Sequence, residues 1–163
     1  MTKKLNRFSV SMILVATIGF VLSIVGLVLP WFTIRNEMRS YGYGLFENFL
    51  KTEFPIEVLQ SFAIVTLILA VAACIVFVLC SLGIIKIKRI YRIVYAVVVI
   101  LFALLTFNFT IVVLKDYYAH YVGIPLMGEP QPNIGAFLLS FGAMITTIPL
   151  FCNKKSSNDK NKQ

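Results

Sequence analysis

Long apolar segments alternate with short polar ones along the chain. Four apolar segments stand out, over residues 8–31, 59–85, 93–114 and 134–152. An α-helix rises 1.5 Å per residue, so about 20 residues cross a hydrocarbon layer of about 30 Å. Each of the four segments is long enough to do so. The pattern therefore predicts an all-α membrane protein whose four transmembrane helices form a bundle.

The first apolar segment has an alternative interpretation as a cleaved signal peptide. Its length exceeds the roughly 7–15 apolar residues of such peptides, and Pro30-Trp31 is a poor cleavage site. We therefore expect a retained helix and a single transmembrane domain over residues 1–152. The tail, residues 153–163, has no apolar residue and is expected to be disordered.

Charged residues separate into two groups when the polar segments are taken in turn. The N-terminal segment, the segment between the second and third apolar runs and the tail hold eleven basic residues against the single acidic Asp159. The two other polar segments, 32–58 and 115–133, hold four basic and six acidic residues. Basic residues concentrate in cytoplasmic segments. We expect a protein of the cell membrane with both termini in the cytoplasm and these two loops outside.

Composition supports lipid as the main partner. Of the 163 residues, 59% are hydrophobic and 13% are charged, whereas soluble domains are about half apolar and about a quarter charged. The net charge of +8 comes from basic residues placed between apolar runs, not from a basic binding face. Nucleic acid is therefore not an expected partner.

Residue types that bind metals or carry redox chemistry are few and scattered. Cys74, Cys80 and Cys152 lie in apolar runs or at the edge of one, so we expect neither a disulfide framework nor a thiol redox centre. His120 is the only histidine, and no second histidine or cysteine is near it in the sequence. We expect no metal site and no cofactor, although copper or iron shared with a partner subunit is left open.

The interiors of the predicted helices contain no Asp, Glu, Lys, Arg or His. Proton-coupled carriers, channels and pumps usually place ionisable groups at that depth, so the pattern disfavours them. Asn108 is the one strongly polar residue there, and we expect it to serve helix packing or self-association. Small residues three or four positions apart also predict close helix packing, within the bundle rather than with a partner protein. They are Gly19, Ser23 and Gly26 in the first helix and Ala136, Ser140 and Ala143 in the fourth.

The first external loop carries two runs typical of strands. Residues 31–34 are aromatic or β-branched, and residues 40–46 alternate tyrosine with glycine before Leu45-Phe46. Two such runs predict a short β-hairpin above the membrane. Tyrosines of the second external loop extend this aromatic surface. The interaction residues expected from both loops are Trp31, Tyr41, Tyr43, Gly44, Leu45, Phe46, Tyr117 and Tyr121.

This layout resembles the claudin and peripheral-myelin-protein superfamily of four-helix membrane proteins. Members have cytoplasmic ends and a first external loop with β-strands, a Trp, a later Gly-Leu-Trp and two cysteines. Here Trp31 follows the first helix, and Gly44-Leu45-Phe46 stands in place of Gly-Leu-Trp, but the cysteine pair is missing. The resemblance implies lateral association and partner contacts through the external loops, with Trp31 and residues 44–46 structural.

Three classes of function remain to be weighed. The favoured one is a non-catalytic structural or accessory membrane protein that self-associates or is a subunit of a larger membrane complex. The alternative is a small oligomeric transporter or channel, since hydrophobic gates need no charge. An enzyme is disfavoured, because catalysis needs positioned acids, bases or metals, and the helices supply none.

Overall fold

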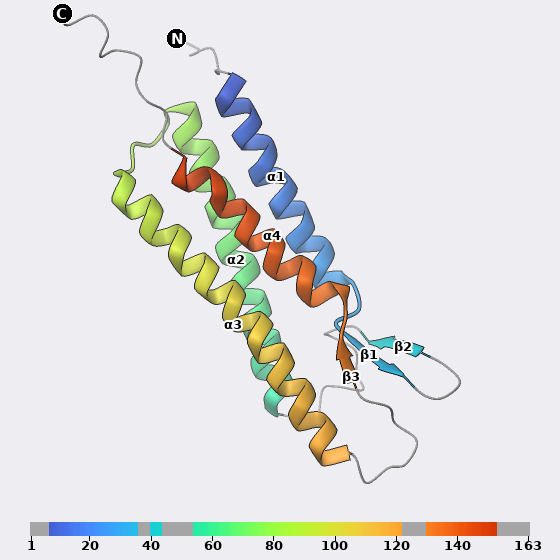
Figure 1. The fold of residues 1–163 in the computed structure, drawn as a ribbon. Helices are drawn as coiled ribbons and strands as arrows, with labels where there is room; N and C mark the ends of the chain where they lie inside the picture. The colour runs from blue at the N-terminus through green and yellow to red at the C-terminus, as the bar shows by residue number, and fades with distance from the viewer. Residues whose placement is uncertain (1–6, 36–39, 44–53, 122–129, 153–163) are drawn as a thin grey trace, which may run out of the picture.

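The computed structural model describes residues 7–35, 40–43, 54–121 and 130–152, with the backbone alone at 7–8, 34–35, 40–43, 54–56, 114–121 and 130–131. Four helices and three short strands follow one another along the chain (Figure 1). They are α1 (Arg7–Val28), β1 (Phe32–Arg35), β2 (Ser40–Tyr43), α2 (Phe54–Leu82), α3 (Arg89–Tyr121), β3 (Pro130–Pro132) and α4 (Ile134–Phe151).

The four helices confirm the predicted all-α bundle. Each contains a stretch long and apolar enough to cross a membrane: Ser9–Val28, Glu57–Leu82, Arg89–Val113 and Ile134–Phe151. α1 begins and α4 ends at the same end of the bundle, and the α2–α3 connection lies there too (Figure 1). The strands lie at the opposite end, which we call the sheet end.

Helix boundaries follow local backbone chemistry. α2 ends three residues before the predicted limit because Gly83 adopts φ 76° directly after it. The amide of Gly83 donates to the Cys80 carbonyl at 3.1 Å and that of Ile84 to the Leu79 carbonyl at 3.0 Å, which is the Schellman arrangement. α3 continues to Tyr121, beyond the predicted limit at Leu114, because no glycine or proline interrupts the sequence before Gly123.

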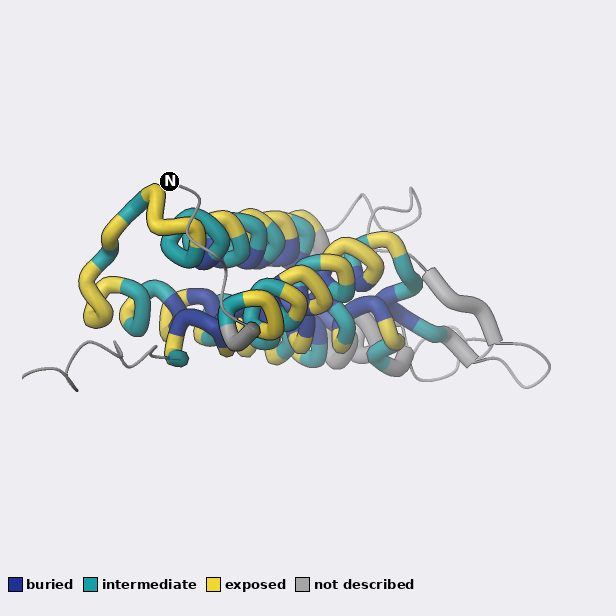
Figure 2. Tube along the Cα trace, turned by 90° about the horizontal axis from the view of Figure 1, so that it is seen from above, coloured by how far each residue is buried: buried dark blue, intermediate teal, exposed yellow. Residues whose placement is uncertain are grey.

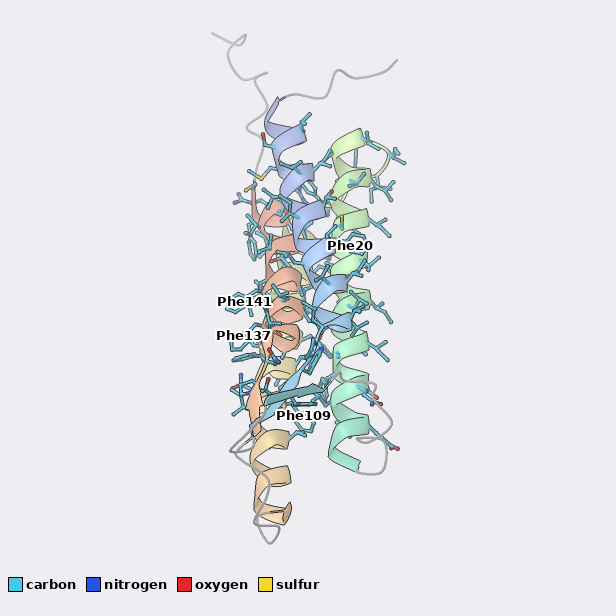
Figure 3. The ribbon with its side chains drawn as sticks, turned by 90° about the vertical axis from the view of Figure 1, so that its right-hand side faces the viewer. Phe20, Phe109, Phe137 and Phe141 are labelled. Atoms are coloured by element: carbon cyan, nitrogen blue, oxygen red, sulfur yellow. The ribbon has the colours of Figure 1, made fainter. Side chains whose placement is uncertain are left out.

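α4 is the central helix of the bundle. It packs against α1, α2 and α3, and 56% of its apolar span is buried, compared with 22–33% of the other three spans. Figure 2 shows buried positions on the inward faces of the helices and exposed positions on their outer faces. Since those outer faces are apolar, lipid is the solvent that suits them.

The three strands form one antiparallel sheet in the order β2-β1-β3. The predicted hairpin is confirmed: β1 pairs with β2, with Phe32 opposite Tyr43 and Ile34 opposite Tyr41. β3, from the second long loop, pairs with the other edge of β1, with Phe32 opposite Pro132 and Ile34 opposite Pro130. The sheet therefore joins two loops that are far apart in the sequence. Thr33 and Asn133, which are hydrogen-bonded to each other, are separated by 100 positions.

Candidate functional site

The sheet end is built directly on the ends of α1 and α4. β1 begins soon after α1, and β3 leads into α4 through Asn133. The Asn133 amide donates to the Trp31 carbonyl at 2.8 Å, and its side-chain Nδ2 donates to Thr33 Oγ1 at 2.6 Å. Asn133 Oδ1 also accepts from the Ile134 amide at 2.7 Å, which caps α4. Asn133 thus links β1 and β3 to the N-terminus of α4 through hydrogen bonds.

Trp31 pairs a backbone carbonyl near the end of α1 that has no amide partner in its own helix. The Gly26 carbonyl would ordinarily accept from the amide four residues later, but that residue is Pro30, which has no N–H. Trp31 Nε1 donates to the Gly26 carbonyl at 2.9 Å instead. The side chain is fully buried, with 0% exposed. Trp31 is therefore an internal packing residue, and its predicted place on an interaction surface is wrong.

α1 and α4 approach each other at backbone distance. A Cβ added to Gly19 would lie 2.6 Å from the Thr146 amide nitrogen, and one added to Gly142 would lie 2.6 Å from the Ser23 amide nitrogen. A Cβ on Gly26 would collide with the backbone at Leu139. Only glycine fits at these positions, which is the small-residue packing that brings helices close in lipid. The predicted residues Gly19, Ser23 and Gly26 all lie in this contact.

The predicted small residues of α4 are buried in the bundle, and the two alanines among them pack against residues of α2 and α3. Ala136 belongs to an apolar cluster with Leu59 and Val113, and Ala143 belongs to a second cluster with Ala70 and Ala103. Ser140 is buried as well, and within the described part of the chain its Oγ has no hydrogen-bond partner. The glycines of α4 instead face α1.

Hydroxyl groups join α2 to α3 inside the bundle. Thr66 Oγ1 and Thr106 Oγ1 lie 2.7 Å apart, and Thr106 Oγ1 also donates to the Phe102 carbonyl at 2.8 Å. Thr110 Oγ1 donates to the Thr106 carbonyl at 2.8 Å. All three threonines have 0% of their surface exposed. The interhelical hydroxyl contact was missed in the sequence.

A signal for this contact exists in the sequence. Alanines and threonines recur every three or four positions along α2, and along α3 the same spacing holds with one valine in the row. The rows are Ala63, Thr66, Ala70 and Ala73 in α2, and Ala96, Val99, Ala103, Thr106 and Thr110 in α3.

Asn108 does not pack between the helices of the bundle, and self-association, the other role expected of it, stays a prediction. The residue is exposed on the outer face of α3. Its Nδ2 donates to the Leu104 carbonyl of the same helix at 2.9 Å. Helical spacing explains the difference, because Thr106 and Thr110 occupy the inward face and Asn108 lies midway between them on the opposite side.

The other predicted interaction residues are only partly described. Tyr41 and Tyr43 lie in β2, and Tyr117 and Tyr121 lie in the last turns of α3. Gly44, Leu45 and Phe46 lie outside the described residues. The structure therefore places the backbone of β2 in the sheet. The contacts of these four tyrosine side chains stay a prediction.

Within the described ranges, no group of three His, Cys, Asp or Glu residues is arranged to hold a metal ion. His120 lies in α3, and its side chain falls outside the described part. The three cysteines are free and partly buried.

Comparison of the chain with protein-family models, with curated proteins and with solved structures finds no match. The geometry of the helices and of the sheet end is thus the basis for a functional proposal.

Proposed function

We propose that this chain is a multi-pass protein of the cell membrane, with cytoplasmic termini, that acts as a non-catalytic structural or accessory subunit. It associates with itself or with a larger membrane complex, and its external contact surface is the sheet end. The proposal extends to a distant relationship with the claudin and peripheral-myelin-protein superfamily, which the hairpin directly after Trp31 supports.

The observation that carries the proposal is the unequal character of the two sheet edges. β3 has prolines at 130 and 132, which cannot donate hydrogen bonds, so this edge is blunted. β2 pairs only with β1 among the described strands, and its Ser-Tyr-Gly-Tyr sequence keeps every amide. An edge strand that has no second partner strand among the described residues, on a rigid support, suits strand addition by a partner.

The support is rigid because the sheet is fixed to the bundle at several points. Trp31 and Asn133 bind it to α1 and α4, and the Gly135 amide donates to the Pro30 carbonyl at 2.9 Å. A pre-organised surface loses less conformational entropy when a partner binds, so it favours association.

The test is purification from the native membrane in mild detergent, followed by mass spectrometry of the proteins that accompany the chain. We expect a stoichiometric partner or a homo-oligomer. Changing Tyr41 and Tyr43 together to Ser should abolish the assembly while leaving membrane insertion intact. Tyr91→Ser is the matched control, since Tyr91 is 63% exposed and lies in the first turn of α3, which begins at the end of the bundle opposite the sheet.

Two results would redirect the proposal. Unchanged assembly in the double variant would remove the side chains of Tyr41 and Tyr43 from the contact surface. Solute movement through liposomes that contain the purified protein would favour the alternative, an oligomeric transporter or channel.

A further inference from the structure

The outer face of α3 has a feature that the bundle does not use. Asn108 lies about two helical turns before Lys115, the first charged residue after the span, which is about 10 Å along the axis. An Asn side chain offers two N–H donors and two acceptor positions. The structure gives this side chain one hydrogen bond, from Nδ2 to its own helix. The remaining groups face the hydrocarbon layer, which cannot pair them.

The residues on the same face as Asn108 form a regular row. They are spaced alternately by four and three positions, and all of them are exposed. We call this row the α3 seam; it consists of Val94, Val98, Leu101, Leu105, Asn108 and Val112. An average spacing of 3.5 residues is the repeat of helices that pair as a left-handed coiled coil.

The exposed fractions support a continuous surface. Val94, Leu101, Leu105 and Val112 are 54%, 53%, 52% and 48% exposed. The inward face of α3, by contrast, carries the alanines and threonines that contact the bundle. α3 thus has one face committed to the bundle and one apolar face with a single carboxamide in it.

We propose that the α3 seam pairs with the α3 seam of a second copy of this chain, with the two Asn108 side chains hydrogen-bonded to each other. Copies inserted in the same orientation are related by a two-fold axis parallel to the membrane normal. Such an axis places both Asn108 residues at the same depth, so Oδ1 of each accepts from Nδ2 of the other. A single asparagine in an apolar seam also fixes its register.

A second copy fits the α3 seam better than an unrelated helix does. An isologous contact supplies each open donor and acceptor with its counterpart at the same height, without any further residue. The proposal rests on the proposed function only in requiring that the chain spans the membrane. It does not involve the sheet end.

The test measures dimerisation of the full chain in vesicles of phosphatidylcholine, by energy transfer between labelled copies at varied protein-to-lipid ratios. Asn108→Leu should weaken association at least about threefold, the lower range for an interhelical hydrogen bond in lipid. Asn108→Gln, which keeps the carboxamide, should retain part of the affinity. Thr17→Val is the matched control because Thr17 is exposed on α1 and its hydroxyl binds only the Ile13 carbonyl of its own helix at 2.9 Å.

Cross-linking locates the contact independently of affinity. In a background where Cys74, Cys80 and Cys152 are replaced by Ala, Leu101→Cys should form a disulfide-linked dimer on oxidation. Ile68→Cys, exposed at 59% on α2, should not. Equal affinity of Asn108→Leu and the wild type, or equal cross-linking at positions 101 and 68, would overturn the proposed pairing of two α3 seams. Either result leaves a partner at the sheet end unaffected, so the two proposals fail separately.

Discussion

The bundle contains two helix pairs that solve the same problem by different means. α1 and α4 meet through glycines, so that their backbones come into contact. α2 and α3 meet through side chains larger than glycine, namely alanines and the Thr66–Thr106 hydroxyl pair. A hydrogen bond from Tyr95 Oη to the Leu69 carbonyl, at 2.9 Å, also joins them. In lipid, apolar burial gives little drive for helix association, so van der Waals contact and hydrogen bonds must supply it.

The difference predicts how each pair responds to substitution. The α1–α4 contact depends on shape, because a Cβ at its glycines would strike the backbone, which cannot rotate away. The α2–α3 contact depends on individual hydrogen bonds, which are worth less and can be replaced by isosteric apolar groups. The α1–α4 pair also carries the sheet end, so its geometry decides where β1 and β3 meet.

The largest effect should come from Gly26→Ala. Helix propensity alone favours Ala over Gly by about 1 kcal/mol, but the new Cβ would collide with the backbone at Leu139. We expect a net loss of about 3 kcal/mol in the free energy of unfolding, at the upper range for overpacking. Unfolding in mixed detergent micelles, followed by circular dichroism, measures it.

Val25→Ala serves as the control for Gly26→Ala, since Val25 is adjacent in α1 and 40% exposed on the outer face. It should change stability by less than about 1 kcal/mol, because the side chain is exposed and its replacement brings no atom into the α1–α4 contact. If Gly26→Ala were as stable as the wild type, the α1–α4 pair would not differ from α2–α3 in the way described.

The sequence predicts the shape-dependent pair better than the hydroxyl pair, and for a physical reason. Glycine and serine at three- and four-residue spacing stand out against apolar residues, so Gly19, Ser23 and Gly26 identify their own face. Four apolar runs of sufficient length likewise fix the number of helices. Thr66 and Thr106 stand out less, because a threonine can bond to its own helix and needs no partner.

Other features depend on contacts that no local pattern contains. β3 is three residues long and holds two prolines, so nothing in it suggests a strand until β1 is beside it. Asn108 is the most polar residue of the third apolar segment, but polarity alone does not show which side of a helix faces the bundle. The inward positions of α3 settle that question, since Ala96, Ala103 and Thr106 are fully buried.

An intermediate effect is expected from Trp31→Phe. The substitution removes the Nε1 donor and leaves the buried Gly26 carbonyl without a partner, because Pro30 supplies no amide. A buried unpaired carbonyl costs about 1–3 kcal/mol. We expect a loss of about 2 kcal/mol in the free energy of unfolding. Circular dichroism measures it, because Trp31 is the only tryptophan and the variant has no tryptophan fluorescence to follow.

Pro30→Ala sharpens this prediction by returning an amide to position 30. If the missing donor is the cause, Trp31→Phe should cost less in the Pro30→Ala background than in the wild type. The same loss in both backgrounds would mean that the volume of the indole ring matters and the hydrogen bond does not.

The smallest effect concerns the hydroxyl pair of α2 and α3. Thr66→Val and Thr106→Val each keep the shape of the side chain and remove the 2.7 Å contact between the two oxygens. A double-mutant cycle with both variants isolates their interaction. We expect a coupling free energy of about 0.6–1.7 kcal/mol, the range for such bonds between membrane helices.

Thr110→Val provides the matched cycle. Thr110 is as deeply buried, but its hydroxyl binds only the Thr106 carbonyl, at 2.8 Å in its own helix. A cycle of Thr66→Val with Thr110→Val should therefore give a coupling near zero. Equal coupling in the two cycles would show that α2 and α3 are held by packing alone, as α1 and α4 are, because the direct oxygen contact exists in one cycle and not in the other.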